Sequence, residues 1–457
     1  MTRRLTFALA ALSALAALPP RPAAAQTVPQ WQELAASPYN SYRSEDVFFI
    51  GQRGWSVSGA GGGRASRTLD GGTTWSAPLA LNGYLRATAF ATPEIGWIGV
   101  LFSPVQLYET RNGGATYTDV TARIQPALPA GMGLCGMWAL DAQTVYAVGQ
   151  YSTPAYIVRT TNGGQTWTSR AMAPLVDALI DIRFFDAQHG LATGGIGPYS
   201  DSRARIIGTN DGGATWTVRH TVEGLYGVGW KMTFPTRMVG YASVERFTND
   251  PDGETDAIVL KTVDGGQTWA EMRIPDAGSL QGIGFATPEL GWISGRGLTS
   301  VTTDGGASWT RLPPTRTGPT APVTPGGQLD GSINRFRFSG DTLAYAAGFK
   351  IYRLRRRLPT AGADAPASDV PDGLVAVYPN PAVGPVTVAY RTATTGPVTL
   401  DVVDVRGRTV AVLVDGPVAP GDHAATWTPA RTAPGVYIVR LRTAQGVTAR
   451  RIAVAGR

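Results

Sequence analysis

The chain has few of the residues that build disulfides and zinc sites. Its 457 residues include one cysteine, Cys135, and three histidines, at positions 189, 220 and 423. One cysteine cannot form a disulfide within the chain, and the scattered histidines form no zinc-ligand motif. Cys135 lies in the apolar run 133–138, so we expect it to pack inside a strand rather than to act as a nucleophile.

Lysine is equally scarce. Residues 231, 261 and 350 are the three lysines, so the formal net charge of +7 is carried almost wholly by arginine. A nucleic-acid-binding protein gathers basic residues on one face, with aromatic residues between them. Here the dense basic run is 353–357, beside a Pro/Ala-rich segment. We therefore expect no nucleic-acid partner and interpret this run as a solvated domain end; contact with an anionic surface is the alternative.

Long apolar runs are confined to the first 26 residues. Arg3 and Arg4 precede the apolar stretch 5–18, and three alanines at 23–25 provide small residues for cleavage. This is the order of a secretory signal peptide. A membrane anchor is the alternative, but the stretch is shorter than the roughly 20 apolar residues that span a bilayer. We predict a signal peptide over residues 1–25 and a secreted protein.

Glycine is abundant, with 57 residues, and many of them belong to a repeat. Six times the chain reads Thr, any residue, Asp or Asn, Gly-Gly, any residue, Thr or Ser, then Trp or Tyr; we call this segment the octet. The central residues are Asp70, Asn112, Asn162, Asp211, Asp264 and Asp304, and the closing aromatic residues are Trp75, Tyr117, Trp167, Trp216, Trp269 and Trp309. Their spacing of roughly 40 to 50 residues is typical of four-stranded propeller blades.

Each position of the octet suits a tight hairpin turn. An Asp or Asn side chain can accept hydrogen bonds from backbone amides further along the turn, and Gly-Gly supplies the positive φ angles that such turns need. The closing aromatic residue can pack across the turn onto the neighbouring strand. The octets resemble the Asp-boxes, or BNR repeats, of sialidase-like and related propellers.

A second pattern lies between the octets: an aromatic residue, a turn, then Gly followed by an aromatic or aliphatic residue. Its clearest copies are 90–99 and 285–292, and looser copies stand at 49–59, 138–149, 184–194, 234–241 and 338–348. Seven hairpins against six octets leave one blade without its fourth strand. We predict that Trp31–Leu34 supplies this strand beside Ile351–Leu354, which closes a seven-bladed ring and removes the exposed sheet edges.

The repeated region is similar to propellers of the photosystem II assembly-factor type. These share the octet and the Phe-x-x-Pro-x-x-Gly-Trp hairpin that stands at 90–99 and 285–295. The ring also hosts hydrolases, lyases and scaffolds, so fold alone does not define activity. The resemblance implies the shape and protein binding, not a photosystem, and we expect no catalytic residues.

A sialidase-like glycoside hydrolase acting on extracellular glycans is the alternative. Retaining sialidases use an arginine triad, a Tyr/Glu pair and an Asp acid near the ring axis, and their Phe/Tyr-Arg-Ile-Pro motif precedes the first box. The similar string 272–275 follows the fifth octet, so we interpret it as an outgoing strand. Glu94 and Glu289 occupy equivalent turn positions of two repeats, which favours a turn role. Three arginines and two carboxylates converging on one face of the channel would favour the enzyme.

Loops on a rigid ring often carry binding chemistry. We therefore name as candidate ligand-binding residues the aromatic and arginine residues that we place on the longer connections. They are Tyr84, Arg86, Tyr151, Tyr156, Tyr199, Arg203, Arg205, Tyr226, Trp230, Arg246 and Phe247. Each can equally be a solvated loop residue or a plug at a strand end.

Four carboxylates alternate along one insertion, at Asp250, Asp252, Glu254 and Asp256. Alternating oxygens can wrap a calcium ion, but Gly253 does not stand where a helix–loop–helix calcium site has its glycine. A solvated acidic loop is the alternative. We expect no cofactor, with calcium at this loop as the one candidate.

The C-terminal quarter has a different composition. Residues 359–373 form a Pro/Ala-rich linker that is too poor in large apolar residues to build a core. Residues 374–457 show short alternating strands, at 386–390, 398–403, 409–413, 424–427, 436–441 and 449–454. This spacing suits a small antiparallel, immunoglobulin-like sandwich.

The C-terminal segment resembles the type A C-terminal sorting domain of the type IX secretion system. Among the residues that carry the resemblance are Pro379, Asn380, Pro381, Gly407, Gly435, Tyr437, Arg450 and Arg451. The resemblance implies export across the inner membrane, passage through the outer-membrane translocon, removal of the sorting domain and attachment of the remainder to surface lipopolysaccharide. Arginine at the terminal motif stands where lysine is frequent, a mild change for a charge contact.

The sequence thus predicts an all-β protein: a seven-bladed β-propeller over residues 27–358, a linker, and a sorting domain over 374–457. We expect a monomeric, secreted protein displayed on the exterior of the outer membrane. Its predicted partners are the type IX secretion machinery and an unknown protein or glycan ligand. Its predicted role is that of a non-enzymatic binding or scaffold module.

Overall fold

The computed structural model describes most of the chain outside its N-terminus and the linker. The described residues are 29–39, 41–150, 154–198, 201–223, 227–246, 256–275, 277–295, 297–315, 320, 328–339, 343–355, 373–378, 382, 386–419, 421–429 and 432–454, and the statements below concern them. The chain divides into two compact units, Met1–Arg355 and Arg356–Arg457. The predicted signal peptide lies outside the described residues.

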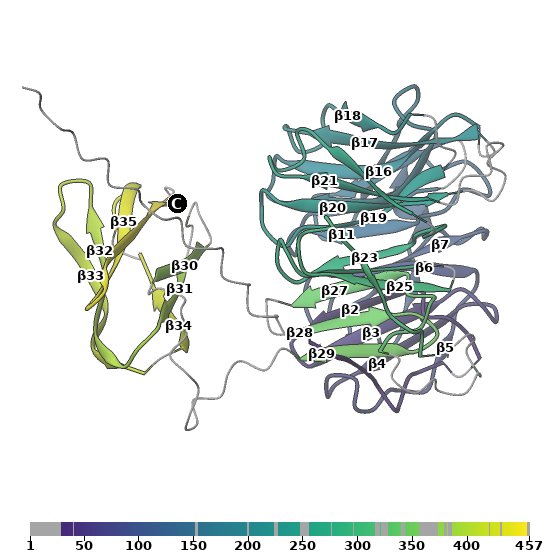
Figure 1. Cartoon of the computed structure of the whole chain (residues 1–457). Coiled ribbons are helices and arrows are strands. Elements are labelled where there is room, and N and C mark those ends of the chain that lie inside the picture. Colours follow the sequence, from purple (N-terminus) through teal and green to yellow (C-terminus); the bar gives the residue numbers. More distant parts are fainter. Residues whose placement is uncertain are drawn as a thin grey trace, which may run out of the picture. The chain divides into compact units, whose positions relative to one another are not determined.

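Seven sheets form the blades of the first unit (Figure 1). Blade 1 contains β2 (Asp46–Ile50), β3 (Arg53–Ser58), β4 (Arg64–Thr68) and β5 (Leu79–Ala80), and blade 2 contains β6 (Tyr84–Phe90), β7 (Gly96–Leu101), β8 (Leu107–Thr110) and β9 (Thr118–Asp119). Blade 3 contains β11 (Gly136–Ala139), β12 (Val145–Gly149), β13 (Tyr156–Thr160), β14 (Trp167–Ala171) and the added β10 (Ile124–Gln125), which follows the short 3-10 helix η1 (Thr121–Arg123). Blade 4 contains β15 (Ala178–Phe184), β16 (Gly190–Ile196), β17 (Arg203–Thr209) and β18 (Thr217–Thr221).

Blade 5 contains β19 (Gly227–Thr233), β20 (Gly240–Arg246), β21 (Ala257–Thr262) and β22 (Ala270–Ile274), and blade 6 contains β23 (Gly282–Phe285), β24 (Gly291–Gly295), β25 (Leu298–Thr302) and β26 (Thr310–Arg311). Blade 7 contains β27 (Arg335–Ser339), β28 (Leu343–Ala347), β29 (Ile351–Arg355) and β1 (Trp31–Glu33). The fold class predicted from the sequence is confirmed. Blade 3 differs from the four-stranded expectation because β10 pairs in parallel with the outgoing strand β14.

The ring closes through the first strand of every blade. The first strands contact one another in the order β2, β6, β11, β15, β19, β23 and β27, and β27 contacts β2 again. Figure 1 shows the result, with β2 and β3 beside β27 to β29. In blade 7 the N-terminal β1 pairs with the C-terminal β29, with Trp31 opposite Leu354. The predicted closing strand is therefore confirmed, and the sheet of blade 7 has no unpaired outer strand at β29.

The strands of a blade run up and down in sequence, which gives the ring two different faces. The octets and the turns between first and second strands lie at one end of the blades, which we call the octet face. The connections between second and third strands, and those from blade to blade, lie at the other end, which we call the crossover face. This division follows from the antiparallel pairing within each sheet.

The octet folds as the sequence predicts, through hydrogen bonds within the turn. In the first copy, the Thr68 hydroxyl donates to Asp70 Oδ1 over 2.8 Å, and Asp70 Oδ1 accepts the Thr74 backbone N–H over 2.8 Å. Gly71 and Gly72 have φ angles of +70° and +86°, which residues with a Cβ rarely adopt. The same Thr-to-Asp or Thr-to-Asn bond recurs in the other five octets. The octet is therefore a self-contained turn.

The second repeated pattern packs neighbouring blades together. Its aromatic residue on the second strand stacks on the phenylalanine of the next blade: Trp55 lies 3.6 Å from Phe90 between ring centroids, at an interplanar angle of 12°. The pattern's glycine allows this phenylalanine to lie flat on its own blade, because a Cβ at Gly96 would come within 2.4 Å of the Phe90 ring. Equivalent stacked pairs join blades 3 and 4, 5 and 6, and 7 and 1.

The octets also receive hydrogen bonds from the preceding blade. The Trp55 indole N–H donates to the Gly113 carbonyl over 2.9 Å, and the Tyr345 hydroxyl donates to the Gly71 carbonyl over 3.2 Å. Lys261 Nζ donates in the same way to Gly305 over 2.9 Å. Each of these octet turns therefore both closes its own hairpin and binds the preceding blade of the ring.

The second unit is a sandwich of two sheets. One sheet contains β30 (Gly373–Tyr378), β31 (Val386–Thr392) and β34 (Gly421–Trp427); the other contains β32 (Gly396–Asp404), β33 (Thr409–Val418), β35 (Gly435–Thr443) and β36 (Gly446–Val454). Val388, Leu400 and Val439 lie in its core. The six predicted strands are present, and β30 is an additional strand that the sequence analysis did not predict.

Candidate functional site

The first strands of four blades carry a charged residue at the same place. It stands three residues before the phenylalanine near the end of the strand: Asp46 before Phe49, Asp181 before Phe184, Lys231 before Phe234, and Arg335 before Phe338. All four charged residues are buried. Because the first strands contact one another around the ring, these side chains meet in its centre, and we call them and their bonded neighbours the channel network.

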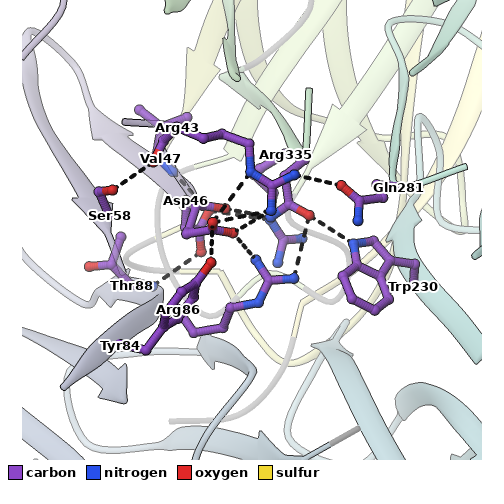
Figure 2. A network of polar contacts seen from close by, with 12 residues as sticks. Arg43, Asp46, Val47, Ser58, Tyr84, Arg86, Thr88, Trp230, Gln281 and Arg335 are labelled. Carbon is purple, nitrogen blue, oxygen red and sulfur yellow. Dashed lines mark hydrogen bonds and ion pairs between the residues drawn. The ribbon is translucent and has the colours of Figure 1, made fainter. Parts of the chain in front are cut away.

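Glu45 anchors one part of the channel network, drawn in Figure 2. Its carboxylate accepts from Arg86 over 2.6 Å, from Arg43 over 3.0 Å and from the Tyr84 hydroxyl over 2.6 Å. Arg86 projects from a β-bulge, since the pairing of β6 with β7 shifts between Leu85 and Ala87. A bulge re-aims one side chain without ending the strand, and here it directs Arg86 to Glu45.

Asp46 and Asp181 share the arginines of blade 7. Arg335 makes a two-pronged bond to Asp181, over 2.9 and 3.0 Å, and its Nε lies 3.2 Å from Asp46 Oδ1. Arg337 Nη2 lies 3.2 Å from Asp46 Oδ2. Asp46 also accepts the backbone N–H groups of Val47 and Thr88, and Asp181 accepts that of Met232. Such two-pronged pairs hold both partners in a defined geometry.

The arginines keep the channel carboxylates ionised. Burial raises the pKa of the Asp181 carboxyl, but Arg335 and Lys231 outweigh it and bring the pKa to about 2. Burial likewise raises the pKa of Glu45 and of Asp46, and in both cases nearby arginines bring it below the ordinary value. All three groups are therefore carboxylates at neutral pH, and none is poised to donate a proton.

Trp230 connects the blade 5 side of the channel to the same network. Its indole N–H donates to Asn334 Oδ1 over 2.7 Å, and the Asn334 amide donates to the Glu45 carbonyl. The Arg86 guanidinium lies 5.1 Å from the centre of the Trp230 ring, a cation–π distance. Gln281 joins from blade 6 by accepting from Arg43 over 2.7 Å (Figure 2).

Three of the sequence-predicted ligand residues, Tyr84, Arg86 and Trp230, thus meet in the channel network. The expectation that they lie on connecting loops is wrong, because they belong to the first strands β6 and β19. The other described candidates also lie on strands, but away from this network: Tyr156 on β13, Arg203 and Arg205 on β17, and Arg246 on β20. Tyr151, Tyr199, Tyr226 and Phe247 lie outside the described residues.

The remaining candidates have local partners. Arg203 forms an exposed ion pair with Glu223 over 2.7 Å, and Arg205 donates to the Thr221 hydroxyl and the Leu175 carbonyl. Arg246 is buried and donates to the Asp256 carbonyl. Of the calcium candidates, Asp250, Asp252 and Glu254 lie outside the described residues; within the described part of the chain, no cluster of His, Cys, Asp and Glu could hold a metal ion.

Several sequence interpretations of single residues are confirmed. Cys135 is fully buried beside Leu101 and Ile180. Residues 272–274 of the string 272–275 are the last residues of the outgoing strand β22, which pairs with β21. Glu94 and Glu289 lie in turns, as predicted: their backbone N–H groups donate to the Thr92 and Thr287 hydroxyls, respectively.

The sorting-motif residues occupy turns and core positions of the second unit. Gly407 has a φ of +79° in the turn after β32, and its N–H donates to the Asp404 carbonyl over 2.9 Å. The Tyr437 hydroxyl donates to the Ala433 carbonyl over 2.7 Å, and Arg450 Nε donates to the Leu374 carbonyl over 3.1 Å. Gly435 begins β35, Arg451 is exposed on β36, and Pro379, Asn380 and Pro381 lie outside the described residues.

The sequence analysis missed most of the channel network. Asp46, Asp181, Lys231 and Arg335 were visible as charges inside apolar strands, at a constant distance of three residues from a repeated phenylalanine. A charge at a fixed place in a buried strand needs a buried partner. The repeat supplied this signal, but it does not tell which blade carries the partner.

Comparison with known proteins agrees with the two-unit division. Residues 376–455 match the family model described as "Secretion system C-terminal sorting domain". This segment is a type IX sorting domain, which marks proteins for secretion to the cell surface. Among the described residues, no helix is both long and apolar enough to cross a membrane. A search of curated proteins found no match.

Two solved structures have a similar fold. YCF48 bound to D1 peptide is 17% identical, with a TM-score of 0.50, and the match covers 73% of this chain and 97% of that one. An ancestral GH74 enzyme is 13% identical, with a TM-score of 0.51, covering 95% of this chain and 64% of the enzyme. At such low identities these likenesses concern the fold alone.

Proposed function

We propose that this protein, which carries a type IX sorting domain behind a seven-bladed propeller, is a surface-displayed, non-enzymatic binding or scaffold protein. The secretion machinery delivers it to the outside of the cell. There the sorting domain is removed, the propeller is attached to surface lipopolysaccharide, and the ring captures a protein ligand.

The state of the channel carboxylates is the observation that carries the non-enzymatic proposal. A glycosidase needs one carboxyl with a raised pKa to protonate the leaving group and a second to act as base or nucleophile. Glu45, Asp46 and Asp181 instead are held by buried arginines, which keep their pKa values low. A network in which every described carboxylate is held by arginines stabilises the ring, and none of these three carboxyl groups has the raised pKa of a proton donor.

The protein-ligand part rests on the fold. The similar structure of YCF48 was solved with a D1 peptide bound, so a propeller of this form can bind a polypeptide. We extend this capacity, and not the identity of the peptide, to the present chain. A rigid ring with many connections at one face is suited to such binding.

A glycoside hydrolase is the second candidate, and one observation favours it. Arg43, Arg86, Arg335 and Arg337 converge with three carboxylates in one channel, which is the kind of cluster that the sequence analysis named as discriminating. The arginines differ from a substrate clamp because they already hold carboxylates of the chain. An enzyme would have to exchange these bonds for bonds to a substrate.

The test is a binding and turnover screen of the purified full chain on surface-protein arrays, glycan arrays and a panel of chromogenic glycosides. Binding to a protein without turnover supports the proposal. Hydrolysis of any glycoside that is abolished in Asp181→Asn or Glu45→Gln, at unchanged circular dichroism, would replace it by the enzyme. Capture of glycans alone, without hydrolysis, would contradict the protein ligand.

Two matched ion pairs allow the binding face to be identified. Arg203 pairs with Glu223 at the crossover face, and Arg53 pairs with Glu94 at the octet face; both pairs span 2.7 Å and both arginines are 45% exposed. We expect Arg203→Glu to weaken capture of a ligand found in the screen and Arg53→Glu to leave it unchanged. The opposite result would place the ligand on the octet face.

A further inference from the structure

Lys231 is a buried lysine for whose Nζ the described residues provide no hydrogen-bond acceptor. The side chain stands on the first strand β19, inside the channel, and is 2% exposed. Its backbone N–H donates to the Ser243 hydroxyl, but within the described part of the chain its Nζ makes no hydrogen bond and no ion pair. Nζ is not among the fully enclosed polar atoms that lack a partner, so solvent reaches this nitrogen in the channel, and its N–H donors are open to a small ligand.

The neighbouring carboxylates do not act as acceptors for Nζ, because among the described residues none of them forms an ion pair with Lys231; they pair with arginines instead. Asp46 is held by Arg335 and Arg337, and Asp181 by Arg335. Glu45 is held by Arg43 and Arg86. When protonated, Lys231 therefore adds a positive charge to a cluster in which four arginines already face three carboxylates.

The groups that act on Lys231 come from four other blades. Arg335 on β27 and Arg86 on β6 disfavour its protonated form, while Asp181 on β15 and Asp46 on β2 favour it. Burial has the largest effect, and together these influences lower the pKa of Lys231 well below its ordinary value. Trp230, the preceding residue, places its ring 5.9 Å from Nζ, which offers a weak cation–π contact and no acceptor.

An added anion would supply both the acceptors that Nζ lacks and negative charge among the arginines. An oxyanion supplies oxygen acceptors to the free N–H donors and a negative charge to the cationic excess. Water can supply acceptors but no charge. Arg43 and Arg337, which are 24% and 16% exposed, mark the parts of the same cluster that solvent reaches.

We propose that Lys231, together with Arg86 and Arg335, forms an oxyanion-binding site inside the propeller channel. The ligand chemistry is a small oxyanion, either a carboxylate or a phosphate or sulfate. The site is distinct from the surface that captures a protein ligand, and it does not depend on that proposed function.

The scarcity of lysine makes the test direct. The chain has three lysines, at 231, 261 and 350, so the full chain labelled with ¹³Cε-lysine gives three sets of NMR signals. The Lys231→Met variant assigns the signal of interest. We would titrate the labelled protein from about pH 5 to pH 10 in sodium chloride, sodium formate and sodium phosphate at equal ionic strength.

We expect the Lys231 signal to titrate far below the usual lysine range in chloride. Formate or phosphate should raise its midpoint by roughly one pH unit or more, because an anion at Nζ favours the charged form. An increase in formate alone indicates a carboxylate site, and an increase in phosphate alone indicates a tetrahedral oxyanion. Identical midpoints in all three salts would overturn the proposal, since general screening does not distinguish the anions.

Thermal unfolding gives a second, independent readout. The effective anion should raise the Tm of the native protein and of Lys231→Arg, by roughly 2 to 4 °C, and should not raise that of Lys231→Met. Lys261→Met is the matched control, because Lys261 Nζ donates to the Gly305 carbonyl at the octet face and should leave the anion response intact. A Lys231→Met protein that responds as the native protein does would refute the site. Should this variant fail to fold, Lys231→Arg assigns the lysine signal instead, and the NMR titration of the native chain still decides the proposal.

Discussion

The closing strand offers the sharpest test of the ring. Trp31 is 4% exposed and packs edge-on against Trp292 and Phe336, with 5.5 Å between ring centroids in both cases. Within the described residues its indole nitrogen has no hydrogen-bond partner, so Trp31→Ala removes packing and no hydrogen bond. Truncation of a buried Trp costs about 3–5 kcal/mol. Unfolding entropy of roughly 2.1 cal/mol/K per residue over residues 29–355 gives ~0.7 kcal/mol/K, so we expect Tm to fall by about 6 °C.

Two matched variants separate closure from general damage. Trp31→Phe keeps a ring in the same place and should cost less than about 1.5 kcal/mol. Gln32→Ala changes the exposed neighbour on the same strand and should leave Tm within about 1 °C. Calorimetry of the full chain measures all three, with the unfolding of the sorting domain as an internal reference. If Trp31→Ala unfolds at the same temperature as Gln32→Ala, β1 does not hold the ring closed.

Three further predictions concern the ring. Arg335→Met leaves two buried aspartates without their shared partner, so we expect the free energy of unfolding in denaturant to fall by about 3–5 kcal/mol. Arg53→Met removes an arginine from an exposed ion pair and should cost less than about 1 kcal/mol. Equal losses in the two variants would contradict the buried network. Gly96→Ala places a Cβ 2.4 Å from the Phe90 ring and should destabilise the protein by about 1–3 kcal/mol, so unchanged stability would show that this ring can move aside. Burial raises the pKa of Asp330 from 3.8 to about 6, so its ionisation should lower stability as pH rises from about 4 to 6, by about 3 kcal/mol in all. Asp330→Asn should remove this slope from a plot of Tm against pH, and an unchanged slope would assign it to other groups.

The local parts of the fold could be predicted because each is encoded within a few neighbouring residues. The octet contains its own acceptor at Asp70 and its own glycines with positive φ. The hairpin at 90–99 likewise contains both the Phe90 ring and the glycine on which it lies. The sorting domain was predictable for a similar reason, since its strands alternate over a short, continuous segment. The count of hairpins and octets then required a closing strand, and the pairing of Trp31 with Leu354 confirms it.

The channel network could not be predicted from the sequence in the same way. Asp46, Asp181 and Arg335 are separated by more than a hundred residues from one another, and no local pattern says which charge pairs with which. The candidates Tyr84, Arg86 and Trp230 were named for their residue type, yet they were placed on loops. The bulges in β6 and β19 lie at Arg86 and Trp230 and turn these two side chains into the channel.

The sequence by itself therefore determined the blade, its turns, the number of repeats and the secretion signal at the C-terminus. The tertiary structure alone decided which charges are buried together, and that Lys231 lies among arginines, with no acceptor for its Nζ in the described part of the chain. The physical reason is range: turn geometry and strand alternation act between neighbours along the chain, whereas an ion pair acts through space and exists only once the ring has closed.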